Sequence, residues 1–245
     1  MTKNQIFVKK IIAKVGKTIN KHNLIQANDK VLVALSGGKD SMVTLDILAR
    51  RLQKIPINYE LTALYVQLDG VKYMADTSYL EEFCKDRNVK FIIKKEKINL
   101  VEGNKSPCFF CSFNRRRILF QQMKQLGYNK LAFGHNLNDA VETFFMNIMF
   151  RNRISALPYK LSMFNGEFEL IRPILELTED DTRQYANIMN FKQMLIPCPY
   201  EKLSNRHTVR TLIEKNEKDY PGFLKNIFYS LHQIDNEYLP HKDSI

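Results

Sequence analysis

The sequence predicts an α/β fold built on a parallel sheet, with a basic amphipathic helix before it and a helical extension after it. Two observations lead to this class. Short apolar runs alternate with stretches of helical periodicity through the middle of the chain, which is the order of parallel strands joined by crossover helices. An apolar run at 31–35 is followed directly by a turn of small residues and then by helical periodicity at 42–48.

The individual elements follow from these patterns. Residues 7–20 are predicted to be helical because apolar side chains recur there at helical spacing. The stretch 151–166 carries turn residues and is expected to be a loop or a small hairpin. The remaining strands are expected at 61–66, 90–94, 130–133 and 169–171. The remaining helices are expected at 76–87, 108–125, 138–150, 178–190, 207–215 and 221–231.

Two of these helices carry a more specific expectation. Thr178 is the predicted N-cap of the helix at 178–190, because the acidic side chains that follow it suit the first turn of a helix. The helix at 138–150 is strongly apolar, so we expect other parts of the chain to cover most of its sides.

Length and composition indicate one principal domain. With 245 residues, the chain can bury one substantial core. It is 44% hydrophobic and 26% charged, which argues against a disordered or fibrous protein. No apolar stretch approaches the roughly 20 residues of a membrane span, and residues 1–8 lack the apolar core of a signal peptide. We therefore expect a cytoplasmic protein with no membrane partner.

The chain is basic, with a formal net charge of +11. An excess of this size is compatible with a polyanionic partner such as RNA, or with nothing more than a solvated lysine-rich surface. The basic side chains gather in two regions, which would suit a long RNA backbone. One is the N-terminal helix with Lys10 and Lys14, and the other contains Arg115 and Arg116.

The turn after the first strand carries the strongest functional signal. Ala34 and Leu35 lead into Ser36-Gly37-Gly38-Lys39-Asp40-Ser41, where two glycines let an anion approach the backbone and the serines and lysine add donors. The spacing is not that of a Walker A loop. A carboxylate beside a phosphate site makes sense with a divalent cation between them, so ATP with magnesium is the expected ligand. The segment resembles the PP-loop ATP pyrophosphatases, which cleave ATP between the α and β phosphates.

Cysteines provide a second signal. In a cytoplasmic protein, Cys108-Phe109-Phe110-Cys111 indicates a metal, cluster or redox motif more than a disulfide. Structural zinc usually needs four ligands, whereas cluster iron is held by thiolates and one iron can lack a protein ligand. Cys198, between two prolines, is the natural third ligand. Cys84 lies at helical spacing with apolar residues and is expected to be a buried core residue.

Polar residues also follow other strands. Asp69 comes directly after the second strand, at the sheet edge where α/β proteins bind ligands, and is a candidate for positioning metal or substrate or else an ordinary turn residue. Gly134 and His135 follow another strand, and Asp139 begins the next helix. These residues are candidates for binding the adenosine or orienting a base, while helix capping explains Asn138 and Asp139 nearly as well.

Taken together, these motifs are similar to one PP-loop branch, the tRNA 2-thiocytidine synthetases of the TtcA family. The matching pieces run in the family's order: the segment from Ala34 to Ser41, Leu68-Asp69, the cysteine pair with the arginines after it, Gly134-His135, Asn138-Asp139, Glu142-Thr143, Ile171-Arg172-Pro173 and Ile196-Pro197-Cys198.

The resemblance implies a Rossmann-like domain of the adenine nucleotide α-hydrolase type, ATP, magnesium and a 4Fe-4S cluster held by Cys108, Cys111 and Cys198. It implies sulfur insertion at C2 of an anticodon-loop cytidine, a cysteine desulfurase or sulfide as sulfur donor, and a homodimer. We divide the chain into the N-terminal helix (1–27), the PP-loop domain with the CxxC (28–195) and a C-terminal segment with the third cysteine (196–245).

Two positions depart from the family's pattern. Glu201 stands where the family usually has a second cysteine after the one matched by Cys198, which leaves Cys198 as the third ligand. Asn136 and Asn138 stand where the family often shows His and Arg, which bears on the nucleotide contacts.

The expected mechanism has two stages. Adenylation of the cytidine O2 would turn it into a good leaving group, with Lys39 on the β and γ phosphates and Asp40 acting through magnesium. Sulfide carried by the cluster would then displace AMP at C2, with Cys108, Cys111 and Cys198 as its ligands. Arg115 and Arg116, with Lys10 and Lys14, would meet the tRNA phosphates.

Other functions remain open from the sequence. The chain could be another PP-loop tRNA enzyme, such as a lysidine synthetase or a 2-thiouridine synthetase. It could also be a non-enzymatic RNA-binding protein that carries a metal. Lysidine chemistry would give the three cysteines no role, and a non-enzymatic protein would give Asp40 none.

Overall fold

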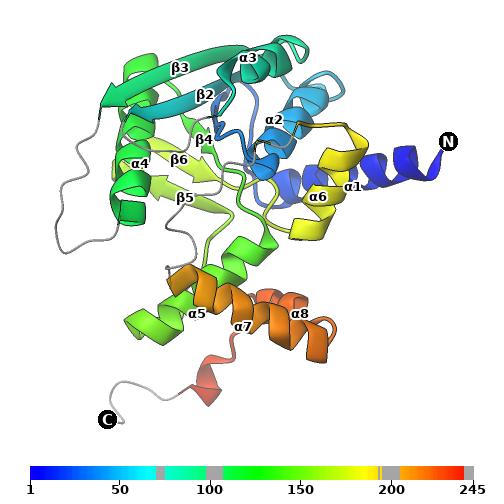
Figure 1. Ribbon diagram of the computed structural model, residues 1–245, viewed down its shortest axis with the longest axis vertical. Coiled ribbons are helices and arrows are strands. Elements are labelled where there is room, and N and C mark those ends of the chain that lie inside the picture. Colours follow the sequence, from blue (N-terminus) through cyan, green and yellow to red (C-terminus); the bar gives the residue numbers. More distant parts are fainter. Residues whose placement is uncertain (70–74, 98–106, 193, 195–204, 240–245) are drawn as a thin grey trace.

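The computed structural model describes residues 1–69, 75–97, 107–192, 194 and 205–239, with the backbone alone at 107 and 108. Within these ranges the fold is a six-stranded sheet with helices on both faces (Figure 1). The predicted α/β class is therefore confirmed. The strands are β1 (Lys30–Ala34), β2 (Glu60–Asp69), β3 (Lys90–Lys97), β4 (Lys130–Ala132), β5 (Lys160–Met163) and β6 (Phe168–Ile171).

The strand order is β3-β2-β1-β4-β6-β5. β1 lies at the centre and pairs in parallel with both neighbours, with Val31 opposite Leu61 of β2 and Lys130 of β4. The chain thus leaves β1 toward one side of the sheet and later returns to its other side. At such a reversal the two loops that follow the strands diverge and leave a crevice in which α/β proteins bind ligands.

The helices form three groups (Figure 1). α4 (Pro107–Leu126) covers one face of the sheet, and α1 (Lys3–Lys21), α2 (Lys39–Leu52), α3 (Thr77–Lys85) and α6 (Glu179–Ile188) cover the other. At one end of the molecule α5 (Leu137–Arg151) contacts α7 (Asn205–Asp219) and α8 (Phe223–Ser230). None of the described helices is both long enough and apolar enough to cross a membrane.

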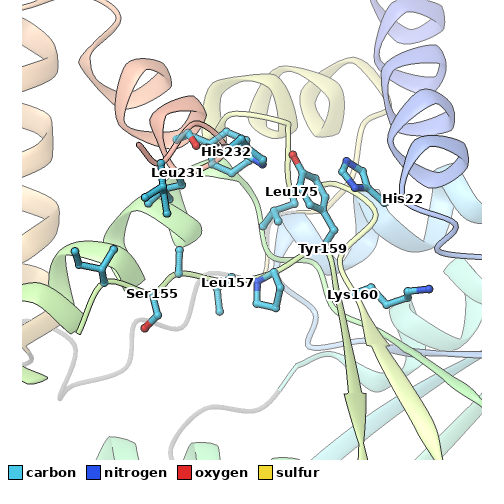
Figure 2. Close-up of a pocket in the computed structure, with 13 residues that line it drawn as sticks. His22, Ser155, Leu157, Tyr159, Lys160, Leu175, Leu231 and His232 are labelled. Atoms are coloured by element: carbon cyan, nitrogen blue, oxygen red, sulfur yellow. Dashed lines mark hydrogen bonds between the residues drawn. The ribbon is translucent and has the colours of Figure 1, made fainter. Parts of the chain in front are cut away.

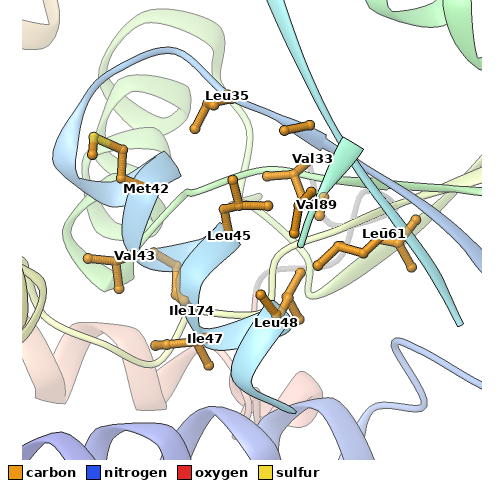
Figure 3. Close-up of a cluster of buried hydrophobic side chains, with 14 of the residues drawn as sticks. Val33, Leu35, Met42, Val43, Leu45, Ile47, Leu48, Leu61, Val89 and Ile174 are labelled. Carbon is orange, nitrogen blue, oxygen red and sulfur yellow. The ribbon is translucent and has the colours of Figure 1, made fainter. Parts of the chain in front are cut away.

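Alternating side chains of β1 divide the core into two clusters. Val31 and Val33 face the cluster with α2, and Leu32 faces the cluster with α4. This alternation is the period of two expected of a strand with both faces covered. In Figure 3, the apolar face of α2 (Leu45, Leu48) packs on Val33 and Leu61 of the neighbouring strands. The helix that follows the first turn is therefore held firmly against the sheet.

A buried carboxylate of α2 bonds this helix to neighbouring elements. Asp46 is 1% exposed and accepts hydrogen bonds of 2.7 Å from Arg50 Nε, 2.7 Å from Arg87 Nε and 2.6 Å from the Tyr185 hydroxyl. A buried charge persists only when it is paired and fully hydrogen-bonded, as Asp46 is. This network joins α2, α6 and the turn after α3, and no pattern in the sequence predicted it.

Most predicted elements are present, with ends that differ by a few residues. Thr178 is the N-cap of α6, as expected, and accepts a hydrogen bond from the Asp181 amide. The stretch 151–166 was expected to be a loop or a small hairpin. It contains β5, which pairs antiparallel with β6, so the hairpin is present. The proposed boundary near residue 195 lies outside the described residues.

One expectation about the helices holds along only part of the helix concerned. The end of the helix at 138–150 is not covered by the described residues, because Ile148, Met149 and Phe150 are 40–47% exposed. The first half of α5 does face α7 and α8, with Val141 and Ala140 buried. The apolar composition of α5 predicted burial along the whole helix. The last turn is exposed because α7 and α8 contact only the earlier part of α5.

Candidate functional site

The loop after β1 folds into a compact turn at the N-terminus of α2. Ser41 Oγ donates to the Gly38 carbonyl (2.8 Å) and accepts from the Ser36 amide (3.1 Å), while the Gly38 amide donates to Ser36 Oγ (3.2 Å). Gly37 has φ +83°, and a Cβ there would lie 2.7 Å from the Ala75 side chain. Only glycine fits both constraints. The loop after β1 therefore presents its backbone at a helix N-terminus, the usual setting for an anion.

Lys39 and Asp40 form an ion pair within this loop. Lys39 Nζ lies 2.9 Å from Asp40 Oδ2 and 3.2 Å from Glu179 Oε1. Burial would lower the pKa of Lys39, but the two carboxylates outweigh it and raise the pKa above its ordinary value. The same ion pair lowers the pKa of Glu179 although burial opposes this. Lys39 therefore stays charged at neutral pH.

Asp40 is held in place from two other elements. Its Oδ1 accepts a hydrogen bond of 2.6 Å from the Thr182 hydroxyl of α6 and one of 3.3 Å from Asn136 Nδ2. Each oxygen of the carboxylate thus has a donor that fixes its orientation. Neither Thr182 nor Glu179 was predicted as a site residue, and only the fold brings them to the loop.

The loop after β4 lies directly against the loop after β1. A Cβ added to Gly134 would be 2.7 Å from the Asp40 carbonyl carbon and 2.7 Å from the Ser41 nitrogen. Backbone cannot move aside as a flexible side chain can, so this contact requires glycine. The two sequence motifs, far apart along the chain, meet where the strand order reverses.

Asp139 caps a helix, one of the two roles that the sequence left open for it. The N-cap of α5 is Asn136, whose side chain accepts from the Asp139 amide (3.1 Å) while Asp139 Oδ2 accepts from the Asn136 amide (3.0 Å). Asn138 instead accepts a hydrogen bond from the Glu179 amide (2.9 Å). The Asn136 departure from the family's pattern therefore supplies both a helix cap and a contact to Asp40.

His135 is partly buried beside a buried arginine. Arg172 Nε donates to His135 Nδ1 over 3.3 Å, and Arg172 Nη1 donates to the Pro158 carbonyl over 2.7 Å. Burial lowers the pKa of His135 to about 3, and the charges of Arg172, Arg206 and Arg116 act in the same direction. His135 is therefore neutral at physiological pH.

A buried glutamate on α5 connects the site to the C-terminal helices. Glu142 is 3% exposed and lies 2.8 Å from Arg210 Nε and 3.1 Å from Arg206 Nε of α7. Burial raises its pKa although both arginines oppose the shift. Arg206 also lies 3.9 Å from Asp139 Oδ1. α7 therefore lies beside the site.

Asp69 ends β2 at the same edge of the sheet. Its carboxylate accepts a hydrogen bond of 3.5 Å from Gln67 Nε2, and no described contact joins it to Asp40. Among the described residues, no group of three or more His, Cys, Asp or Glu side chains is arranged to hold a metal ion. A role for Asp69 with metal or substrate stays a prediction.

The structure places Cys84 and Cys111 in different clusters, on opposite faces of the sheet. Cys84 is fully buried in the cluster with α2, and burial raises its thiol pKa to about 12, as a core residue requires. Cys108 and Cys111 lie one turn apart on α4, and Cys111 packs partly against the other cluster. The Cys108 side chain and all of Cys198 lie outside the described residues. Of the three expected ligands, the structure therefore describes only the side chain of Cys111.

The predicted RNA-binding residues lie on two surfaces. Lys10 is exposed on α1, while Lys14 lies 3.7 Å from Asp181. On α4, Arg116 is exposed and acts on the pKa of His135, whereas Arg115 is half-buried. α4 contains no Asp or Glu, so its charge is wholly positive. Arg117, by contrast, pairs with Glu96 of β3 at 2.8 Å.

A separate cavity of about 580 Å³ lies between the end of α1, the segment before β5 and the end of α8 (Figure 2). Its walls include His22, Tyr159, Phe228 and His232, and the rings of His22 and Tyr159 stack at 3.6 Å. No predicted site residue lines it. It is therefore distinct from the loops that meet at the reversal of strand order.

Comparison with known proteins is consistent with this geometry. The family model of the PP-loop domain matches residues 7–216 of this chain. The tRNA-cytidine(32) 2-sulfurtransferase of Janthinobacterium sp. (strain Marseille) is 35% identical over 243 residues, covering 96% of this chain and 75% of that protein. The enzyme of the same name from Methylobacillus flagellatus is 34% identical, covering 95% of this chain and 78% of that protein.

Solved structures share the fold. The U34-tRNA thiolase NcsA from Methanococcus maripaludis, solved with its 4Fe-4S cluster, has a TM-score of 0.80 and 26% identity, covering 97% of this chain and 81% of that chain. NAD+ synthetase from Burkholderia pseudomallei shares the fold alone, with a TM-score of 0.51 and 13% identity.

Proposed function

The chain belongs to the PP-loop family and, within it, to the tRNA-cytidine(32) 2-sulfurtransferases, and from this we propose that it uses ATP to replace O2 of an anticodon-loop cytidine in tRNA by sulfur. The single observation that carries the proposal in the structure is the contact of Gly134 with the backbone of Asp40 and Ser41. It assembles one site from the two loops that the family's motifs occupy.

The first half of the reaction is adenylation. The amides of the loop after β1 and Lys39 would bind the β and γ phosphates, and the Asp40 carboxylate would hold a magnesium ion that neutralises charge on the departing pyrophosphate. Magnesium fits this position because it prefers carboxylate oxygens together with substrate phosphates. Lys39 is already charged, and its partners Asp40 and Glu179 hold it at the loop. The bond from the α phosphate to cytidine O2 forms as the bond to pyrophosphate breaks.

The second half needs a sulfur source. Cys108, Cys111 and Cys198 would hold a 4Fe-4S cluster, which would supply the sulfur that bonds to C2 as the bond from C2 to the adenylated oxygen breaks and AMP leaves with that oxygen. Support for this ligand set comes from the described residues around it. Cys108 and Cys111 lie one turn apart on the same helix, as a CxxC on a helix must. Met194, whose sulfur accepts from the Asp76 amide near the loop after β1, is four residues from Cys198, a separation that the chain spans in about 14 Å at most.

The acceptor is RNA in this proposal. Arg115 and Arg116 on the wholly basic helix α4 contact tRNA phosphates beside the site, and Lys10 and Lys14 extend the contact along α1. A cytoplasmic homodimer with no membrane partner, supplied with sulfur by a cysteine desulfurase or by free sulfide, completes the proposal. Greater identity to the cytidine enzymes than to the uridine thiolase favours cytidine over uridine as the target.

Anaerobic purification with iron and sulfide quantified, followed by nucleoside analysis of tRNA incubated with ATP, tests the proposal. We expect iron, sulfide, AMP and 2-thiocytidine together. Cys111→Ala and Cys198→Ala should lose iron and thiolation but keep ATP binding, whereas Cys84→Ala, a cysteine of the apolar core, should keep all of them. An active enzyme without iron would overturn the cluster, and 2-thiouridine or lysidine as the product would overturn the acceptor.

A further inference from the structure

The hydrogen bond between Arg172 and His135 determines where the proton of the imidazole lies. A guanidinium N–H can only donate, so His135 Nδ1 must be an unprotonated acceptor. A neutral imidazole with Nδ1 unprotonated carries its proton on Nε2. The direction of one hydrogen bond therefore specifies the tautomer.

The surroundings of Arg172 support a fixed arrangement. Arg172 is 5% exposed, and its backbone amide donates to the Tyr159 carbonyl (2.9 Å) on the neighbouring segment. Its guanidinium bonds to a carbonyl and to an imidazole, both neutral, and no ion pair joins it to a described carboxylate. Burial lowers its pKa to about 10, so it still carries a charge at neutral pH. This charge disfavours a second proton on His135.

The opposite edge of the ring is available to a ligand. Among the described residues no hydrogen-bond partner accepts from His135 Nε2, and this atom is not one of the buried side-chain atoms left without a partner. Phe133 stacks on the ring at 5.3 Å, which further restricts its rotation. Gly134 and Asn136 on either side of His135 contact Asp40. His135 therefore lies between two residues that contact the loop after β1.

We propose that Arg172 is a positioning residue that holds His135 as the Nε2–H tautomer, and that this N–H donates a hydrogen bond to an acceptor atom of the nucleotide bound at the loop after β1. The ligand atom that meets it must be an oxygen or an unprotonated nitrogen, because the ring offers no acceptor on that edge. His135 is then a fixed donor and takes no proton during turnover. The identity of the ligand rests on the proposed function, but the tautomer does not.

Nitrogen-15 NMR of the histidine-labelled enzyme measures the tautomer directly. The chain has five histidines, and the spectrum of His135→Gln assigns the one at 135. We expect an unprotonated Nδ1 and a protonated Nε2, with no titration between pH 8 and pH 5. The charged groups that act on the ring are Asp40 of α2, Arg116 of α4, Arg172 after β6 and Arg206 of α7. A protonated Nδ1 in the folded enzyme would overturn the proposal.

Substitution of Arg172 separates positioning from structure. Arg172→Met should leave both tautomers of His135 populated, while the exposed Arg153→Met should leave the Nε2–H form alone. Arg172→Lys keeps a donor and a charge and should restore much of the Nε2–H form. If the Met variant does not fold, the tautomer in the Lys variant still tests the proposal. A Met variant that folds and keeps the wild-type tautomer would contradict the assignment.

Contact with the nucleotide has its own measurement. Addition of ATP should shift the Nε2 resonance of His135 more than that of Nδ1, and an unmoved Nε2 would overturn the contact. His135→Gln places an amide N–H near the position of Nε2, whereas His135→Asn places it near Nδ1. The Asn variant should bind ATP roughly tenfold more weakly than the Gln variant, the loss expected for one hydrogen bond. Equal affinities would argue against a donor at Nε2. Both results are independent of whether sulfur is transferred.

Discussion

Thr182 and Asp40 lie 142 residues apart in the chain, yet the Thr182 hydroxyl donates a hydrogen bond of 2.6 Å to Asp40 Oδ1. Thr182 is fully buried and belongs to α6, which packs against α2. The carboxylate assigned to magnesium is therefore oriented by a helix that the sequence motifs did not include.

Replacement of Thr182 by Val should weaken the site without changing its shape. The variant keeps the volume of the side chain but leaves Asp40 Oδ1 with Asn136 alone, so we expect the free energy of unfolding to fall by about 1–3 kcal/mol and AMP formation to slow by roughly tenfold. Thr211→Val removes an exposed hydroxyl of α7 and should change neither quantity. Equal behaviour of the two variants in chemical denaturation and AMP release would show that the Asp40 contact is dispensable.

Gly134→Ala should disrupt the site by steric contact. The new methyl group would lie 2.7 Å from the backbone of Asp40 and Ser41, so one of the two loops must shift. A displacement near 1 Å in a positioned site costs roughly 100-fold in rate, and we expect a loss of this order in ATP-dependent thiolation. Gly16→Ala, inside α1, meets only the flexible end of Arg51 and serves as the control. Wild-type activity in the Gly134→Ala enzyme would disprove the contact.

The stability of the enzyme should fall in acid through His135. Its folded-state pKa of about 3 lies below the ordinary value of 6.5, so the unfolded chain binds the proton first. The contribution is complete above pH 6.5 and decreases as the pH falls toward 3, by up to about 1.4 kcal/mol per pH unit. Denaturation at pH 7, 6, 5 and 4 should show a shallower decline for His135→Gln. Parallel curves for the two proteins would mean that the ring is not neutral in the fold.

Glu142→Gln should loosen the C-terminal helices. The substitution leaves Arg206 and Arg210 without a charged partner at this position, and because both arginines are partly exposed we expect a loss of about 1–3 kcal/mol in unfolding free energy. Hydrogen exchange should increase in α7 and in the first turns of α5 more than in the sheet. Glu237→Gln removes an exposed carboxylate near the C-terminus and should leave exchange unchanged. If Glu142→Gln exchanged in α7 no faster than Glu237→Gln, Glu142 would not hold α7 against α5.

Arg116→Ala should weaken tRNA binding but leave ATP binding intact. Arg116 is exposed on a helix without acidic residues, so its guanidinium is suited to a phosphate. Removal of one phosphate contact should lower the slope of log affinity against log salt by about 1. Lys85→Ala, on α3 at the opposite face of the sheet from α4, is the charge-matched control. An unchanged salt slope would remove Arg116 from the RNA surface.

The sequence was sufficient for the fold class and for the two loops of the site. Strand-sized apolar runs and the small residues after them depend on local chemistry, which is visible along the chain. Thr182, Glu179 and Arg172 were not predicted as site residues, because their roles come from partners far away in the sequence. Their own neighbours in sequence look like an ordinary helix start and strand end.

Helix capping shows the same limit at short range. The sequence placed Asn138 and Asp139 at the start of a helix and left their role open between capping and ligand binding. In the structure Asn136 is the cap, and Asn138 accepts from the Glu179 amide because α6 lies beside it. The prediction for the end of α5 was wrong for a related reason, since composition alone does not tell how far the neighbouring helices extend.

The sheet separates the two apolar clusters, so the two faces of the protein pack independently. Asp46, the loop after β1 and α2 belong to one face, while α4 with its cysteine pair belongs to the other. A change of the Cys111 side chain would therefore act on the face of the sheet opposite the one on which α2 packs, so the packing that supports the loop after β1 should be insensitive to it.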